Sequence, residues 1–178
     1  MTLRQDEVLM KNSKAKKIAV PAVMIALAFT LSYLESLLPL NLGIPGIKLG
    51  LANFVTVTAI YLLPPGWAFA IALVRILLSG LTFGNAFSLI YSLCGGLLSF
   101  GVMMAFKRTK LSPVGVSMLG GISHNAGQLA AAAVLLGTPA IAYYMPVLLI
   151  AGTATGLLIG IVADQIIKRL KRINFDKN

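Results

Sequence analysis

The sequence predicts an all-α, polytopic membrane protein with six transmembrane helices and with both termini in the cytoplasm. Hydrophobic residues make up 58% of the 178 residues and charged residues only 11%, whereas soluble globular domains contain roughly 25% charged residues. Six apolar segments alternate with polar or Gly/Pro-rich segments, and six helices of about 20 residues fit this length. We therefore expect one membrane domain and no second folded unit.

Three basic clusters set the predicted orientation. Of the 15 Lys and Arg residues, all but Lys48 and Arg75 lie near the N-terminus, in the 107–110 segment or near the C-terminus. Basic clusters that flank apolar spans mark the cytoplasmic side of a cell membrane, and they attract anionic headgroups of the lipid bilayer. The expected organisation is a cytoplasmic basic tail (1–17), a six-helix membrane domain (18–167) and a second cytoplasmic basic tail (168–178). A nucleic-acid-binding protein would instead carry a basic stripe on a soluble surface, so we expect no nucleic-acid partner.

Each predicted span ends at polar residues, proline or glycine. The first span is longer than the apolar core of a signal peptide, which has about 7–15 residues, and no small-residue cleavage site follows it. The second and third spans are short, and Pro64-Pro65-Gly66 separates them. The six predicted spans are 18–38, 51–63, 67–78, 86–106, 114–136 and 140–167.

The second and third spans leave an alternative open. At ~1.5 Å per residue, a 13-residue helix covers about 20 Å of a hydrocarbon core that is ~30 Å thick. Either these helices extend into their apolar flanks, or the chain has four spans and a re-entrant pair. A re-entrant pair would need protein cover for its backbone polar groups.

Two stripes of small residues predict close helix contacts. Residues four apart lie on one face of a helix, and small side chains there let another helix approach closely in a membrane. The stripes are Gly152, Gly156 and Gly160 in the last span and Ala22, Ala26 and Thr30 in the first. We interpret the glycine stripe as packing within the bundle. The first-span stripe is the better candidate for docking a separate membrane subunit, because a terminal span more often lies at the edge of a bundle.

Polar residues within and beside the spans indicate a ligand cavity. An ionisable group inside a membrane costs about 2.5–3.5 kcal/mol on insertion scales, so such residues point to sites. Most of them fall in the half of the membrane away from the basic clusters, and one polar face of the fifth span carries Ser117, Gly121, His124 and Gln128. The predicted cavity opens to the exterior and has His124 at its floor. The predicted substrate-binding residues are Lys48, Asn53, Arg75, Asn85, His124, Asn125, Gln128 and Glu35.

Structural interpretations of these residues remain open. His124 also suits a hydrogen-bonded packing role, and Arg75 suits an ion pair with Glu35. Lys48 suits a headgroup contact, and Tyr143-Tyr144 suits the aromatic belt at the membrane interface. The excess of Lys48 and Arg75 over Glu35 favours an anionic or carbonyl-rich ligand, because an unpaired buried cation is costly.

We find no catalytic motif. The sequence has no G-x-x-x-x-G-K-[ST] phosphate loop, and one His and one Cys do not make a metal site. Its three Asp residues are far apart, unlike the aspartate-rich magnesium–diphosphate site of prenyl-chain synthases. We therefore expect no catalytic residue, no metal, no cofactor and no enzymatic activity of this chain alone.

Four stretches of the sequence carry a resemblance to a known family. They are IPGIKLGLANFVTVTAIYLL (44–63), LLSGLTFGN (77–85), SLCGGLLSFGVM (92–103) and GGISHNAGQLAAA (120–132). The chain resembles the Gx transporter family, also labelled heptaprenyl diphosphate synthase component I, over nearly all of the sequence beyond residue 17. That family is similar to the S components of energy-coupling-factor transporters. S components are small six-helix proteins that bind a vitamin or a similar molecule at the outer side.

The resemblance implies a function and a partner. In S components an Ala-x-x-x-Ala stripe on the first helix contacts a membrane coupling subunit, and separate ATPases drive transport; Ala22 and Ala26 match that stripe. We therefore expect a solute-binding subunit of an importer for an unidentified small molecule. One alternative is a non-catalytic membrane subunit of heptaprenyl diphosphate or quinone biosynthesis, which would need an apolar groove open to lipid. The other is an accessory of membrane electron transfer, suggested by redox genes that lie beside those of relatives.

Overall fold

The computed structural model describes residues 2–37 and 50–175, which form helices joined by short turns. The all-α prediction is confirmed for these residues, which contain no β-strand. The elements are α1 (Thr2–Leu37), α2 (Asn53–Leu62), α3 (Pro65–Phe83), α4 (Ala86–Phe106), α5 (Pro113–Leu136), the 3₁₀ helix η1 (Pro139–Tyr144) and α6 (Met145–Phe175).

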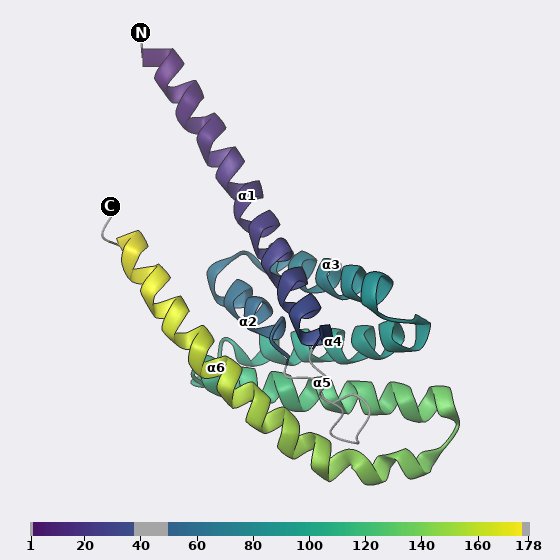
Figure 1. Ribbon diagram of the computed structural model, residues 1–178. Coiled ribbons are helices and arrows are strands. Elements are labelled where there is room, and N and C mark those ends of the chain that lie inside the picture. The colour runs from purple at the N-terminus through teal and green to yellow at the C-terminus, as the bar shows by residue number, and fades with distance from the viewer. Residues whose placement is uncertain (1, 38–49, 176–178) are drawn as a thin grey trace.

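Five helices, α1, α3, α4, α5 and α6, form an open ring, and the short helix α2 bridges its two ends. Contacts join α1 to α3, α3 to α4, α4 to α5 and α5 to α6, and Figure 1 shows α3, α4, α5 and α6 as successive rows. The short helix α2 contacts both α1 and α6, and it also touches α3 and α4. As a result, α5 is covered by α4 on one side and by α6 on the other.

The short helix α2 is enclosed by the other helices. Its residues 55–60 are all buried, and a helix that is apolar and covered on every side lies inside a structure and not along its surface. Its ten residues rise only ~15 Å, about half the thickness of a hydrocarbon core. Because α2 is so short, it fills only part of the length of the bundle and leaves the rest to other side chains.

A lysine at the end of α4 holds the C-terminal end of α2. The Nζ of Lys107 donates a hydrogen bond to the carbonyl oxygen of Ile60, and it lies 5.9 Å from the centroid of the Tyr61 ring. A cation at this place complements the carbonyl groups that a helix leaves unpaired at its C-terminus. Partial burial and the like charges of Arg108 and Lys171 lower the pKa of Lys107 below the usual lysine value.

Four helical segments are long and apolar enough to cross a membrane. They are Lys17–Leu37, Pro65–Phe83, Ala86–Phe106 and Ala140–Arg172. The 24 residues of α5 reach span length, but α5 is not among the four, and α2 is too short. The structure thus describes a helical, membrane-embedded protein, and the count of six spans stays a prediction.

The outer helices extend further into the basic tails than we expected. We expected the first helix to begin at residue 18, after a basic tail over residues 1–17, whereas α1 is already helical from Thr2. At the other end, α6 continues past residue 167 through the second basic tail to Phe175. Charged residues are as compatible with a solvated helix as with a frayed tail, so the apolar pattern alone could not place these two boundaries.

The end of the third span also differs from the sequence prediction, whereas the start of the last span agrees with it. We expected the third span to end at residue 78, whereas α3 runs on to Phe83. The Ser79 hydroxyl donates to the carbonyl of Arg75, so this serine continues the helix and does not end it. The last span was expected to begin at residue 140, and the apolar segment long enough to cross a membrane does begin at Ala140. Its first residues belong to η1, and α6 begins at Met145.

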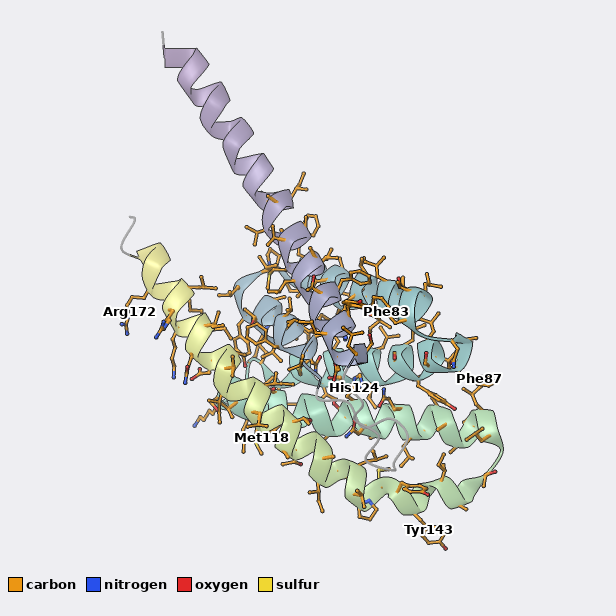
Figure 2. All side chains as sticks on the ribbon, in the orientation of Figure 1. Phe83, Phe87, Met118, His124, Tyr143 and Arg172 are labelled. Atoms are coloured by element: carbon orange, nitrogen blue, oxygen red, sulfur yellow. The ribbon has the colours of Figure 1, made fainter. Side chains whose placement is uncertain are left out.

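The basic clusters share one end of the bundle. The N-terminal end of α1 and the C-terminal end of α6 project from the same side of the molecule in Figure 1. Lys171 of α6 is close enough to Lys107 for the two positive charges to repel each other. Figure 2 places Arg172 at this end and Phe87 and Tyr143 at the other. We call the end with the 107–110 turn and the C-terminal basic residues the basic end. Its cytoplasmic location stays a prediction.

The glycine stripe of α6 packs within the bundle, as the sequence predicted. A Cβ atom added at Gly152 would lie 2.6 Å from the carbonyl oxygen of Gly121 in α5, and one added at Gly156 would lie 2.7 Å from the Cα of Met118. A Cβ at Gly160 would likewise approach the α5 backbone to 2.8 Å. Only glycine permits helices to approach this closely.

The small-residue stripe of α1 faces away from the bundle. Ala22, Ala26 and Thr30 are all exposed, whereas Pro21 and Ala28 on the same helix are buried. The Thr30 hydroxyl donates to the carbonyl oxygen of Ala26 within the helix. The stripe is therefore not covered by the part of the chain that the structure describes, and its role in docking a subunit stays a prediction.

Candidate functional site

A cavity of about 450 Å³ lies inside the bundle, and all six α-helices contribute to its wall. Small-molecule sites in proteins have volumes of roughly 300–1,000 Å³. The lining residues are Ser32, Glu35, Ser36, Gly50, Asn53, Arg75, Ile76, Ser79, Gly80, Phe83, Gly84, Asn85, Ser88, Ser92, Gly121, His124, Asn125, Gln128, Thr155, Gly156 and Ile159. Most of them carry hydrogen-bonding side chains, which is unusual for the interior of a membrane protein.

The cavity lies in the half of the bundle opposite the basic end. It is lined by the last turns of α1 and α3 and by the first turns of α4, whereas the basic residues lie at the opposite ends of α1 and α4. In Figure 2, His124 lies between Arg172 at the basic end and Tyr143 at the far end. The half-length helix α2 accounts for this hollow, because only its N-terminal residues reach the cavity.

Seven of the eight predicted substrate-binding residues line this one cavity. They are Glu35, Asn53, Arg75, Asn85, His124, Asn125 and Gln128. The eighth, Lys48, lies outside the described residues. The fold thus brings together residues that are far apart in the sequence, and their binding of a ligand stays a prediction.

Glu35 of α1 approaches the N-terminal end of α2. Its Oε1 accepts a hydrogen bond of 2.5 Å from the backbone N–H of Gly50, and Gly50 in turn accepts one from the N–H of Asn53, the first residue of α2. A carboxylate is favourable there because the first N–H groups of a helix are unpaired and carry a partial positive charge. Glu35 therefore has a structural role at the cavity wall besides any contact with a ligand.

Arg75 of α3 brings a cation to the same wall. Its Nε is buried and has no hydrogen-bond partner among the described residues. The negative charge of Glu35 attracts the positive charge of Arg75 through space. Among the described residues, an ion pair shorter than 4.0 Å forms between Lys168 and Asp164, but none forms between Arg75 and Glu35. The direct Arg75–Glu35 bridge that the sequence left open is therefore not formed.

His124 and Gln128 line the cavity from α5, one helical turn apart. Helix α4 leaves room for them at a glycine: a Cβ atom added at Gly95 would lie 2.7 Å from the Cγ of Gln128 and 3.4 Å from the Cε1 of His124. The Gly120–Gly121 and Gly95–Gly96 pairs thus serve close packing, and Gly95 also provides the space for the two polar side chains.

Two of the predicted asparagines have structural hydrogen bonds. The Nδ2 of Asn125 donates to the carbonyl oxygen of Leu148 at 2.7 Å and so joins α5 to α6. Asn85 precedes α4, where its Oδ1 accepts from the N–H of Ser88 and its own N–H donates to the Ser88 hydroxyl, both at 2.8 Å. This reciprocal pair is a capping box that stabilises the start of α4. Asn85 and Asn125 are accordingly weaker ligand candidates than Arg75.

The polar face of α5 is divided between two environments. Gly121, His124 and Gln128 line the cavity, but Ser117 is buried against α6, where a Cβ at Gly160 would lie 3.0 Å from the Ser117 Cβ. The expectation of one continuous polar face on the cavity is therefore wrong at Ser117, because α6 crosses α5 closely at that turn.

The sequence interpretation missed several cavity residues. Ser32, Ser92 and Thr155 line the cavity, and they carry only weak sequence signals because hydroxyl groups often bond to their own helix backbone. Thr155 does so with the carbonyl of Ala151. A usable signal was helical spacing: Ser32 lies three residues before Glu35, and a cavity-facing residue predicts others three or four positions away.

The polar groups on the cavity wall are of several chemical kinds. Among the described residues, no three His, Cys, Asp or Glu side chains group in a way that could hold a metal ion. The groups that converge are one guanidinium, one carboxylate, one imidazole, amides and hydroxyls. Such a set can position a polar small molecule by hydrogen bonds.

Comparison with known proteins identifies one family. The model of the family described as heptaprenyl diphosphate synthase component I matches residues 24–166. The match includes nearly all of the six predicted spans; only residues 18–23 and residue 167 lie outside it. No curated protein and no solved structure matches the chain significantly. Since the match covers well over half of the sequence, the chain belongs to the heptaprenyl diphosphate synthase component I family.

Proposed function

We propose that the chain is a solute-binding membrane subunit of an importer of the energy-coupling-factor type, located in the cell membrane. In this proposal the cavity binds a small polar molecule from outside the cell. A separate membrane subunit, driven by ATPases, then couples that binding to transport. The chain itself carries out no chemical reaction.

The observation that carries the proposal is the cavity itself. Polar side chains inside a membrane are costly and face protein or water, and here they converge from six helices on one space of about 450 Å³. The space lies away from the basic end, which the distribution of Lys and Arg assigns to the cytoplasm. A molecule arriving from outside would meet this half of the protein first.

The exposed stripe of α1 supports the partner in this proposal. Ala22, Ala26 and Thr30 are small and uncovered by the rest of the chain, and such stripes allow a second transmembrane helix to approach closely. The spacing matches the Ala-x-x-x-Ala stripe through which S components contact their coupling subunit.

The family description favours a second candidate function, a non-catalytic subunit of heptaprenyl diphosphate synthesis. Such a subunit would hold a long isoprenoid chain, which requires an apolar surface. The three lining residues with apolar side chains are Ile76, Phe83 and Ile159. Polar groups of the wall that lack a structural hydrogen bond, such as the Nε of Arg75, would stay unsatisfied against an isoprenoid, at a cost of about 1–3 kcal/mol each.

Native mass spectrometry of the protein purified from membranes in a mild detergent tests the proposal. We expect a retained polar small molecule and, when partners are co-expressed, a complex with another membrane subunit. Retention of an isoprenoid diphosphate, or a stable complex with a soluble prenyl-chain synthase, would favour the second candidate and contradict the first.

A further inference from the structure

Arg75 has hydrogen-bond donors that no described residue satisfies. A guanidinium carries five N–H donors and no acceptor. The Nε of Arg75 is buried without a partner, and the side chain lines the cavity. Burying a cation without a hydrogen-bonded partner is among the costly arrangements in a protein interior, so a ligand that supplies acceptors at this point would relieve that cost.

Glu35 offsets the charge of Arg75 without filling its donors. The carboxylate accepts from Gly50 at the start of α2 and influences Arg75 only through space. No described residue accepts a hydrogen bond from the Nε of Arg75, and the carboxylate of Glu35 lies on the same wall. A ligand group that carries a single negative charge is tolerated beside Glu35 better than a dianion, because repulsion grows with charge.

We infer that the cavity binds its ligand through a carboxylate group placed against Arg75, with the uncharged polar part of the molecule directed to His124 and Gln128. This inference rests on the proposed solute-binding function and names the class of solute. The planar fork of a guanidinium matches a carboxylate with two parallel hydrogen bonds. A phosphate monoester, which has about −1.5 to −2 charges at pH 7, fits less well beside Glu35.

The remainder of the wall supports an uncharged second part of the ligand. Apart from Glu35 and Arg75, the described polar lining residues are amides, hydroxyls and the imidazole of His124. Gln128 can both donate and accept hydrogen bonds. Together they suit carbonyl, amide or hydroxyl groups on a small monocarboxylic acid.

Side-chain NMR of arginine in nanodiscs tests the carboxylate position directly. The protein has five arginines, at positions 4, 75, 108, 169 and 172, and the signal absent from Arg75→Lys identifies the Nε–H of Arg75. The probes are sodium acetate, acetamide and inorganic phosphate, each titrated at constant ionic strength. We expect acetate to shift the Arg75 signal saturably at millimolar concentrations, acetamide to leave it unchanged, and phosphate to act at least several-fold more weakly than acetate.

Matched measurements separate the carboxylate site from general anion binding. Arg108 is exposed at the basic end, so its signal should shift only linearly with acetate, and Arg108→Gln should leave the Arg75 titration unchanged. An Arg75 signal that ignores acetate, or that follows acetamide or phosphate equally well, would overturn the inference. If a polar molecule without a carboxylate nevertheless co-purifies in native mass spectrometry, the carboxylate inference fails while the solute-binding function stands.

Discussion

The Nζ of Lys107 donates a hydrogen bond to the carbonyl oxygen of Ile60 and so joins the end of α4 to the end of α2. Glu35 makes the complementary contact at the other end of α2, through the N–H of Gly50. An anionic group thus lies at the positive end of this helix and a cationic group at its negative end. The two contacts fix a ten-residue helix that is too short to be stable alone.

Replacing Lys107 should destabilise the fold. Lys107→Met keeps most of the aliphatic side chain but removes the charged hydrogen bond to Ile60, which we expect to cost about 1.5–3 kcal/mol of unfolding free energy. Thermal unfolding in detergent measures this change. Lys110→Met is the control, since Lys110 is exposed and should change stability by less than about 0.5 kcal/mol. Equal effects of the two variants would contradict the anchoring role.

The close approach of α5 and α6 should not tolerate a single methyl group. A Cβ at Gly121 would lie 2.1 Å from the carbonyl oxygen of Gly152, so Gly121→Ala must separate the two backbones. We expect a loss of about 1–3 kcal/mol or more in thermal unfolding. Gly101→Ala in α4 meets nothing within 4 Å and should stabilise the helix by about 0.5–1 kcal/mol. An unchanged melting temperature in Gly121→Ala would mean that the two helices can move apart without cost.

The sequence singled out residues that lie on one cavity wall, but it placed several helix boundaries incorrectly. Ionisable and amide residues are rare in membrane spans, so Arg75, His124 and Gln128 stood out, and they do line one cavity. The tertiary details could not be predicted from one sequence. Nothing in the pattern indicated that Ser117 lies against α6.

Helix lengths depended on local contacts that a pattern does not contain. The Ser79-Gly80 pair looked like the end of a helix, yet Ser79 bonds to the backbone of Arg75 and α3 continues. The role of Lys107 was also hidden, because a basic residue after an apolar span suggests a cytoplasmic loop whether or not it reaches another helix. The short second span was predicted, but its enclosed position came only from the structure.

Two alanines on α1 offer a matched test of the docking stripe. Ala26 is exposed, so Ala26→Leu should leave the melting temperature of the isolated protein within about 2 °C while it blocks close approach of a partner helix. Ala28 is fully buried in the core, so Ala28→Leu should lower stability by about 1–3 kcal/mol. Co-purification of the membrane coupling subunit measures assembly. Undiminished assembly of the Ala26→Leu protein would exclude this stripe as the docking surface.

Cysteine labelling in whole cells tests the predicted orientation. The sequence has one cysteine, Cys94, which is replaced by alanine first. A membrane-impermeant maleimide added outside should label Tyr143→Cys, because Tyr143 is 86% exposed at the far end, and should not label Lys110→Cys at the basic end. Both cysteines should react once the cells are permeabilised. Labelling of Lys110→Cys in intact cells would refute a cytoplasmic basic end.

The most direct test of the solute-binding function compares ligand retention by cavity variants. The amount of polar small molecule bound per protein, measured by mass spectrometry at increasing dilution, gives an apparent affinity for each variant. Ser99→Ala is the control, because Ser99 bonds to Gly120 between α4 and α5 and does not line the cavity. We expect His124→Ala and Gln128→Ala each to weaken binding by about 1–3 kcal/mol, or roughly 5- to 150-fold, with Ser99→Ala unchanged. Full retention by both cavity variants would contradict a ligand site in this cavity.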